Sequence, residues 1–140
     1  MIFFDSHAHY NDPKFDNDRK EILESTYNSG VTKVLNAGYN LETSKKAIEM
    51  AEEYDFIYAS VGISPNDVEN VEKGEFQSHL EQIKRLANCS KVVAIGEIGL
   101  DYYWNKENKD IQKEIFIKQI DIANELNLPI IVHTRDSSRR

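Results

Sequence analysis

Two histidines stand two residues apart at the end of the first apolar segment of the chain. Residues 1–9 form a run of strand length that carries Asp5, His7 and His9 toward its end. Alternate side chains of a strand share a face, so both imidazoles project from one side. Two neutral imidazoles at this spacing can bind one divalent metal without bending the backbone. The spacing therefore predicts a metal site, with a surface turn that holds two histidines as the alternative.

A carboxylate and a third histidine end two later apolar segments. Glu97 follows residues 92–95 closely, and His133 ends the segment 130–132. The carboxyl ends of parallel strands meet at one edge of a sheet, which would bring these groups to the first histidine pair. Three imidazoles and a carboxylate suit one or two divalent ions, and the two oxygens of Glu97 can bridge a pair. The predicted metal ligands are His7, His9, Glu97 and His133, with Glu97 also assigned as catalytic.

Each of the two later ligands has a purely structural alternative. The backbone of Gly96 and Gly99 can fix the charge of Glu97 without a metal. His133 can be a core histidine whose ring nitrogens are capped by hydrogen bonds. The shared position of these residues after separate strands favours metal ligation for both.

Two aspartates are placed to support the imidazoles. Asp5 lies one strand step before His7 on the same face, and Asp101 follows shortly after Glu97. A carboxylate behind a ligating imidazole orients the ring and raises its basicity. We predict this supporting role for both aspartates, and the alternative for Asp5 is the capping of a loop.

Residues past the strand ends are candidates for contact with a substrate. Arg135 can clamp a phosphate with two parallel hydrogen bonds, or it can pair with Asp136 or Asp101. The aromatic run 102–104 can stack on bases, or its rings can pack under a loop. We assign Arg135 and Tyr102 to substrate binding.

Length, charge and cysteine content narrow the class of protein. The 140 residues suit one domain, and the single Cys89 excludes an internal disulfide. No run of about 18 apolar residues and no signal-peptide pattern is present, so we expect a cytoplasmic protein without a membrane segment. The formal net charge is −7. The chain therefore lacks a global basic surface for nucleic acid, and a polyanion would need cations held in a local site.

Apolar segments alternate with helical patterns along the whole chain. The expected strands are 1–9, 31–37, 56–61, 92–95 and 130–133. Between them, apolar residues recur at helical spacing in four segments, of which the first two are expected to be capped by Asp18 with Glu21 and by Asn40. Such alternation predicts a parallel sheet covered by helices, in a TIM-type barrel or a doubly wound sheet. His79 falls in the third helix and is expected to be a surface histidine.

Three motifs resemble the TatD-type deoxyribonuclease family of metal-dependent hydrolases. They are the segments 5–9 (DSHAH), 96–103 (GEIGLDYY) and 129–136 (PIIVHTRD). The resemblance implies a TIM-type barrel of α/β class, two divalent ions (Mg, Mn or Zn) and hydrolysis of DNA phosphodiesters. By position, it implies that His7 and His9 bind one metal, that Glu97 bridges, and that His133 binds the other.

The chain departs from the family pattern in two respects. Ser64 stands where the family usually has a histidine in a Gly-x-His-Pro stretch. We assign Ser64 to substrate binding, although a serine cannot replace imidazole as a proton carrier near neutral pH. Family members are also longer, so we expect residues 1–140 to be one domain incomplete at its C-terminus, with the first five strands and four helices of the barrel. Exposed sheet edges would then favour self-association.

Two other functions remain open. The same ligands serve a hydrolase of small esters, lactones or amides, because only the substrate pocket distinguishes these reactions. An incomplete barrel can also persist as a non-catalytic module. The preferred interpretation is a metal-dependent deoxyribonuclease with DNA as its substrate.

Overall fold

Five strands and four helices alternate along the chain, as the sequence predicts. The computed structural model describes residues 1–137. The strands are β1 (Phe3–Ala8), β2 (Val31–Ala37), β3 (Ile57–Val61), β4 (Val92–Asp101) and β5 (Ile130–Arg135). The helices are α1 (Arg19–Asn28), α2 (Leu41–Glu53), α3 (Phe76–Leu86) and α4 (Lys109–Leu126). Single 3-10 turns lie at Pro13–Phe15, Val68–Asn70 and Lys73–Glu75.

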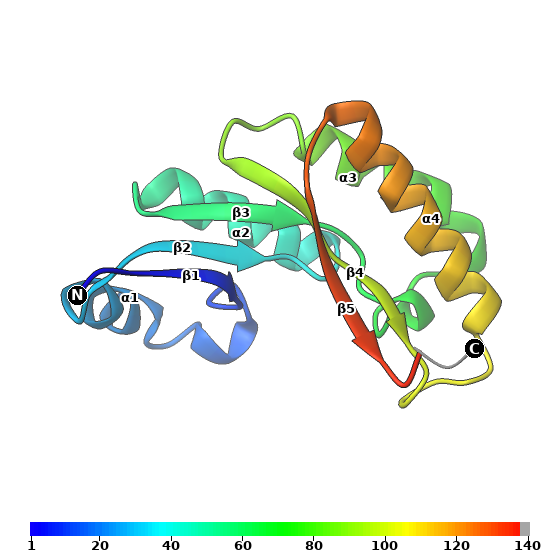
Figure 1. Ribbon diagram of the computed structural model, residues 1–140, viewed down its shortest axis with the longest axis horizontal. Helices are drawn as coiled ribbons and strands as arrows, with labels where there is room; N and C mark the ends of the chain where they lie inside the picture. The colour runs from blue at the N-terminus through cyan, green and yellow to red at the C-terminus, as the bar shows by residue number, and fades with distance from the viewer. Residues whose placement is uncertain (138–140) are drawn as a thin grey trace.

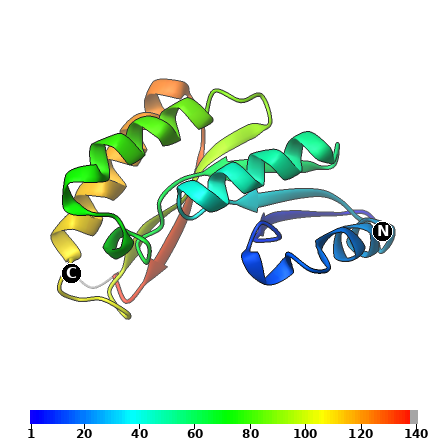
Figure 2. The same cartoon turned by 180° about the vertical axis from the view of Figure 1, so that it is seen from behind.

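The five strands form one curled parallel sheet in the order β1-β2-β3-β4-β5. In Figure 1 β1 and β5 are the two edges of this sheet, α2 lies behind β2 and β3, and α3 and α4 lie together to the right of β4 and β5. Figure 2 shows the same three helices from their outer side. The arrangement is half of a TIM-type barrel, which confirms the predicted fold class. All five carboxyl ends point toward one rim, where such barrels carry their chemistry.

The core lies between the sheet and its helices. Its largest fully buried apolar side chains come from every layer: Leu23, Met50, Ile57, Ile63, Ile83, Ile95, Ile98 and Ile115. Fully burying one such side chain contributes roughly 1.5–3 kcal/mol to folding. This core fixes the middle strands and leaves the polar strand ends free for the rim. Within residues 1–137 no helix is long and apolar enough to cross a membrane.

The two edge strands are far more exposed than the middle of the sheet. Phe3 and Phe4 of β1 are 51% and 60% exposed, and Val132 of β5 is 45% exposed. By contrast, Val61 of β3 and Ile95 of β4 have no exposed surface. Each edge strand has a hydrogen-bonded neighbour on one side only, so its other edge and the side chains near it are open to solvent.

Two local predictions need correction. The carboxylate of Asp18 does not cap α1, because the Asp18 backbone (φ −135°, ψ 12°) lies outside the extended region that a capping side chain requires. The Asn40 cap is confirmed: its side chain accepts a 2.8 Å hydrogen bond from the Thr43 N–H, and the Thr43 hydroxyl accepts one from the Asn40 N–H. The fourth strand does not end at Ile95 either. After an irregularity between Ile95 and Ile98 it continues to pair with β5.

Candidate metal centre

Glu97 lies at the centre of the rim with three imidazoles around it. Its Oε2 atom is 3.3 Å from His7 Nε2 and 3.2 Å from His9 Nε2. Its Oε1 atom is 2.9 Å from His133 Nδ1. The two oxygens therefore face opposite sides of the group, with the β1 end on one side and β5 on the other.

The residues present fit a divalent metal. One ligand atom from each of His7, His9 and Glu97 lies within 4.8 Å of the others. Imidazole nitrogen and carboxylate oxygen are donors that Zn, Mn and related ions accept. His133 adds a third nitrogen on the far oxygen of Glu97, so the donor set also suits two ions that share this carboxylate.

The ring of His9 is held so that Nε2 faces the carboxylate. Its Nδ1 atom lies 2.9 Å from the carbonyl oxygen of Ala37, which ends β2. A backbone carbonyl can only accept, so Nδ1 carries a proton and donates it. The neutral ring then presents an unprotonated Nε2 to the centre, which is the tautomer that a metal requires.

His133 is oriented by Asp101, as predicted for a supporting carboxylate. His133 Nε2 is 2.9 Å from Asp101 Oδ2, and this hydrogen bond turns Nδ1 toward Glu97. Asp101 has no exposed surface, and its Oδ1 accepts hydrogen bonds from the N–H groups of Tyr103 and Trp104. Burial raises the pKa of Asp101, but the hydrogen bonds, led by that of His133, hold it below its usual range.

The side chain of Asp5 contacts a different group from the one predicted. Its Oδ1 atom accepts a 3.1 Å hydrogen bond from the backbone N–H of His7. This is the loop-capping alternative, because the contact reaches the main chain of His7 and not an imidazole ring. The pairing of β1 with β2 shifts register between Asp5 and Ala8, so simple strand alternation does not extend through the motif. Asp5 therefore fixes the backbone that carries the first ligands.

In the absence of a metal, His9 and Glu97 shift each other's pKa values. The hydrogen bond with Glu97 raises the pKa of His9, although burial opposes the shift. Burial raises the pKa of Glu97, but the hydrogen bond and charge of His9, with the charge of His7, outweigh it and leave that pKa lowered. Metal binding needs an unprotonated Nε2, so the raised pKa of His9 makes metal binding favour higher pH.

Arg135 packs on the aromatic run and forms no ion pair within the described part of the chain. Its guanidinium carbon is 3.8 Å from the centre of the Tyr103 ring and 5.6 Å from that of Trp104. The Tyr102 N–H donates a 2.9 Å hydrogen bond to the Arg135 carbonyl, and Lys109 Nζ lies 4.7 Å from the centre of the Tyr102 ring. Arg135 is thus a cation stacked on the aromatic run at the end of β5, and Tyr102 joins the ends of β4 and β5.

Ser64 is buried just beyond β3 and serves a loop contact. Its hydroxyl donates a 2.8 Å hydrogen bond to Asp67 Oδ2. Asp67 Oδ1 in turn accepts a 3.3 Å hydrogen bond from the side-chain amide of Asn40 at the start of α2. Ser64 therefore orders the loop after β3, in addition to its predicted place at the rim.

Two buried glutamines of α4 were not predicted, and both hold the rim. Gln112 accepts a 2.8 Å hydrogen bond from the Asp101 N–H and donates a 3.0 Å bond to the Asp101 carbonyl. Gln119 makes the same pair of contacts with Ile63, at 2.7 Å and 3.0 Å. The available signal was two glutamines seven residues apart on the otherwise apolar face of the helix. They tie α4 to the end of β4 at Asp101 and to the loop after β3 that carries Ser64.

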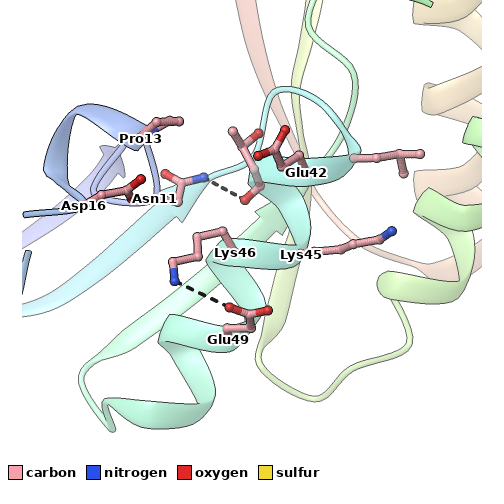
Figure 3. Close-up of a pocket in the computed structure, with 9 residues that line it drawn as sticks. Asn11, Pro13, Asp16, Glu42, Lys45, Lys46 and Glu49 are labelled. Atoms are coloured by element: carbon pink, nitrogen blue, oxygen red, sulfur yellow. Dashed lines mark hydrogen bonds and ion pairs between the residues drawn. The ribbon is translucent and has the colours of Figure 1, made fainter.

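Asn11 performs a similar task for the loop after β1. Its side-chain amide donates hydrogen bonds to the carbonyl oxygens of Ala37 (3.1 Å) and Thr43 (2.9 Å). A hollow of about 510 Å³ lies between this loop and α2. Figure 3 shows the hydrogen bond from Asn11 to the start of α2 at one end of the hollow and the Lys46–Glu49 ion pair at the other. None of the four predicted ligand residues lines this hollow, so the candidate metal centre is a separate feature of the rim.

Comparison with known proteins places the chain in a family. The family model described as TatD related DNase matches residues 4–140. An uncharacterized metal-dependent hydrolase, YabD of Bacillus subtilis, is 46% identical over 137 residues, which are 98% of this chain and 52% of that protein. The 3'-5' ssDNA/RNA exonuclease TatD of Escherichia coli K12 is 33% identical over 98% of this chain and 51% of that protein.

Solved structures agree with the fold. The TatD homologue YJJV of Escherichia coli K12 superimposes with a TM-score of 0.87 at 30% identity, over 96% of this chain and 51% of that one. A TatD-family hydrolase of Entamoeba histolytica gives a TM-score of 0.84 at 24% identity, over 98% of this chain and 51% of that one, which supports the fold alone. The chain spans about half the length of the relatives it matches.

Proposed function

The chain belongs to the TatD-related DNase family of metal-dependent hydrolases, and from this premise we propose that its rim takes part in cleaving DNA phosphodiesters. The observation that carries the proposal is the position of Glu97 between His7 and His9 on one oxygen and His133 on the other. Two divalent ions sharing Glu97 would have protein donors on both sides. The name of the Escherichia coli relative, a 3'-5' ssDNA/RNA exonuclease, supports a nucleic-acid substrate.

Each residue of the rim would have its own role in the reaction. Divalent ions held here would activate water and offset charge on the phosphate oxygens. His7 and His9 would hold one ion through Nε2, His133 the other through Nδ1, and Glu97 both. Asp101 keeps the His133 ring in the orientation that this requires.

Arg135 supplies a cation outside the ligand group. A guanidinium next to the centre can bind phosphate oxygens with two parallel hydrogen bonds, and its stacking on Tyr103 limits the orientations that it samples. In a chain of net charge −7, such a local cation and the bound ions are what would collect a polyanion.

The test is hydrolysis of a labelled single-stranded DNA with Mn²⁺ or Mg²⁺, with a small carboxylic ester assayed beside it. We expect a longer version of the chain to cut DNA, residues 1–140 to do so far more slowly, and the activity of both to be lost in Glu97→Gln. Glu75→Gln is the matched control, because Glu75 also faces a histidine, His79, at 3.7 Å on the surface of α3. Hydrolysis of the ester alone would favour the small-molecule alternative. Equal DNA cleavage by both variants would contradict the proposed role of Glu97.

We also propose that the free edges of β1 and β5 make this chain self-associate. Exposed Phe3 and Phe4 on one edge and Val132 on the other present apolar surface and unpaired main chain together. Sedimentation velocity over a range of concentrations should show dimers or larger species. A monomer that persists at high protein concentration would contradict this proposal.

A further inference from the structure

We propose that a hollow beside the metal centre binds a nucleobase that carries an amino group. The hollow measures about 350 Å³ and lies between the loop after β3 and the loop after β4. It is lined by Pro65, Asn66, Glu69, Trp104 and Asn105. Its volume lies within the range of small-ligand sites, about 300–1,000 Å³. The inference rests on the proposed function, because the base would belong to the DNA strand whose phosphate lies at the centre.

Trp104 supplies the stacking surface. Its side chain is 69% exposed, which is unusual for an indole. Tyr103 meets it nearly at a right angle, with ring centres 4.9 Å apart and planes at 88°. A perpendicular contact of this kind leaves at least one face of the indole free of Tyr103. An exposed aromatic face stacks on a base and is tolerant of base type.

The polar groups of the hollow suit the edge of a base and disfavour a phosphate. The amides of Asn66 and Asn105 offer both donors and acceptors. Glu69 adds a carboxylate, whose Oε2 is held by a 2.9 Å hydrogen bond from the Asn105 amide. A carboxylate repels phosphate but accepts from the amino group of cytosine. Thymine presents a carbonyl oxygen and a methyl group at that place, so the hollow should prefer cytosine to thymine.

One buried carboxylate connects this hollow to the metal centre. Asp101 Oδ1 accepts from the backbone N–H groups of Tyr103 and Trp104, and its Oδ2 accepts from His133. The same side chain therefore fixes the aromatic pair and a metal ligand. The guanidinium carbon of Arg135, a residue that pairs in register with Asp101, lies 5.6 Å from the centre of the Trp104 ring. A nucleotide with its base on Trp104 would have a cation nearby for its phosphate.

The single tryptophan of the chain makes the site directly observable. We would titrate the 140-residue protein, in chelator, with deoxycytidine, thymidine and deoxyribose while recording Trp104 fluorescence. These probes are uncharged, so the net charge of −7 does not oppose them. We expect saturable quenching by deoxycytidine, weaker binding of thymidine and no effect of deoxyribose. Equal affinity for the two nucleosides would overturn the assigned role of Glu69.

Substitutions then locate the binding. Equilibrium dialysis with deoxycytidine should show about tenfold weaker binding to Trp104→Ala. Tyr27→Ala is the matched control, since Tyr27 is also an exposed aromatic residue, at 47%, but lies on α1 and lines a different hollow. An unchanged affinity in Trp104→Ala, or an equal loss in both variants, would overturn the proposal, as would a lack of saturable quenching.

Nucleoside binding and DNA cleavage can each fail without the other. Nucleoside binding in chelator needs neither a metal nor hydrolysis. Quenching without DNA cleavage would leave the base site standing and remove the nuclease proposal. Cleavage without quenching would do the reverse.

Discussion

Two aspartates on the rim each accept a side-chain hydrogen bond near a strand end, but their pKa values shift in opposite directions. Asp101 accepts a hydrogen bond from His133, a side chain of β5, and its pKa is lowered. Asp67 accepts one from Ser64, just beyond β3, and its pKa is raised, with burial as the main cause. Hydrogen bonds from Ser64, Asn40 and Asn70 only partly offset that burial.

The difference lies in the balance between burial and hydrogen bonding. The hydrogen bonds that Asp101 accepts, led by that of His133, outweigh the effect of burial on its pKa, whereas those that Asp67 accepts do not. Asp101 also gains two backbone N–H donors. We conclude that Asp101 orients His133, a predicted metal ligand, whereas Asp67 orders the loop that carries Ser64.

The largest difference between the two aspartates should appear in metal affinity when each is replaced with asparagine. Asp101→Asn should weaken metal binding about 10- to 100-fold, because removing the carboxylate behind a ligating imidazole has effects of that size. Asp67→Asn should leave the affinity within about twofold, since Asp67 contacts no ligand residue in the described structure. Isothermal titration with Zn²⁺ or Mn²⁺ measures both variants. Similar losses in the two would contradict the distinction.

The two buried glutamines of α4 can be compared in the same way, because Gln112 supports Asp101 and Gln119 supports the loop after β3. Gln112→Met removes the side-chain hydrogen bonds to the buried N–H and C=O groups of Asp101, and Gln119→Met removes those to Ile63. Each should lower the free energy of unfolding by about 1–3 kcal/mol, measured by urea denaturation. Only Gln112→Met should also weaken metal binding, because only it supports Asp101. A metal affinity that falls equally in both variants would show that general loosening, not positioning, is responsible.

The pH dependence of stability should show the smallest effect and the clearest sign. Asp67 has a raised pKa in the folded state, so its contribution to stability is present below the unfolded pKa of about 3.9 and is lost as pH rises through the folded value. Removing the ionisable group in Asp67→Asn should therefore improve stability relative to the parent as pH rises from about 3 to 6. Urea denaturation across this range provides the measurement. A relative stability that falls with pH would mean that Asp67 is stabilised as an anion.

Sequence patterns were sufficient to predict the fold and which side chains meet on the rim. Apolar segments interrupted by helical patterns predicted the parallel sheet, and the polar residues at their ends predicted that Glu97 and His133 would meet the first histidines. This works because the ends of parallel strands share an edge, whatever their separation in sequence.

Details that depend on three-dimensional contacts were not predictable in the same way. The continuation of β4 to Asp101 depends on pairing with β5 past an irregularity. The side chain of Asp5 turned to the backbone of His7, a local contact that competes with the strand geometry. Gln112 and Gln119 have a residue type that is usually exposed, and only the loops they clamp explain their burial.

The central claim is that Glu97 joins two groups of metal ligands, and a crystal structure of the chain grown with Mn²⁺ would test it directly. Anomalous scattering locates manganese independently of the protein atoms. The claim predicts an anomalous peak about 2.0–2.2 Å from a Glu97 oxygen, flanked by histidine nitrogen, with the His133 Nδ1 side able to hold a second. A manganese peak elsewhere, with Glu97 still hydrogen-bonded to all three imidazoles, would contradict it.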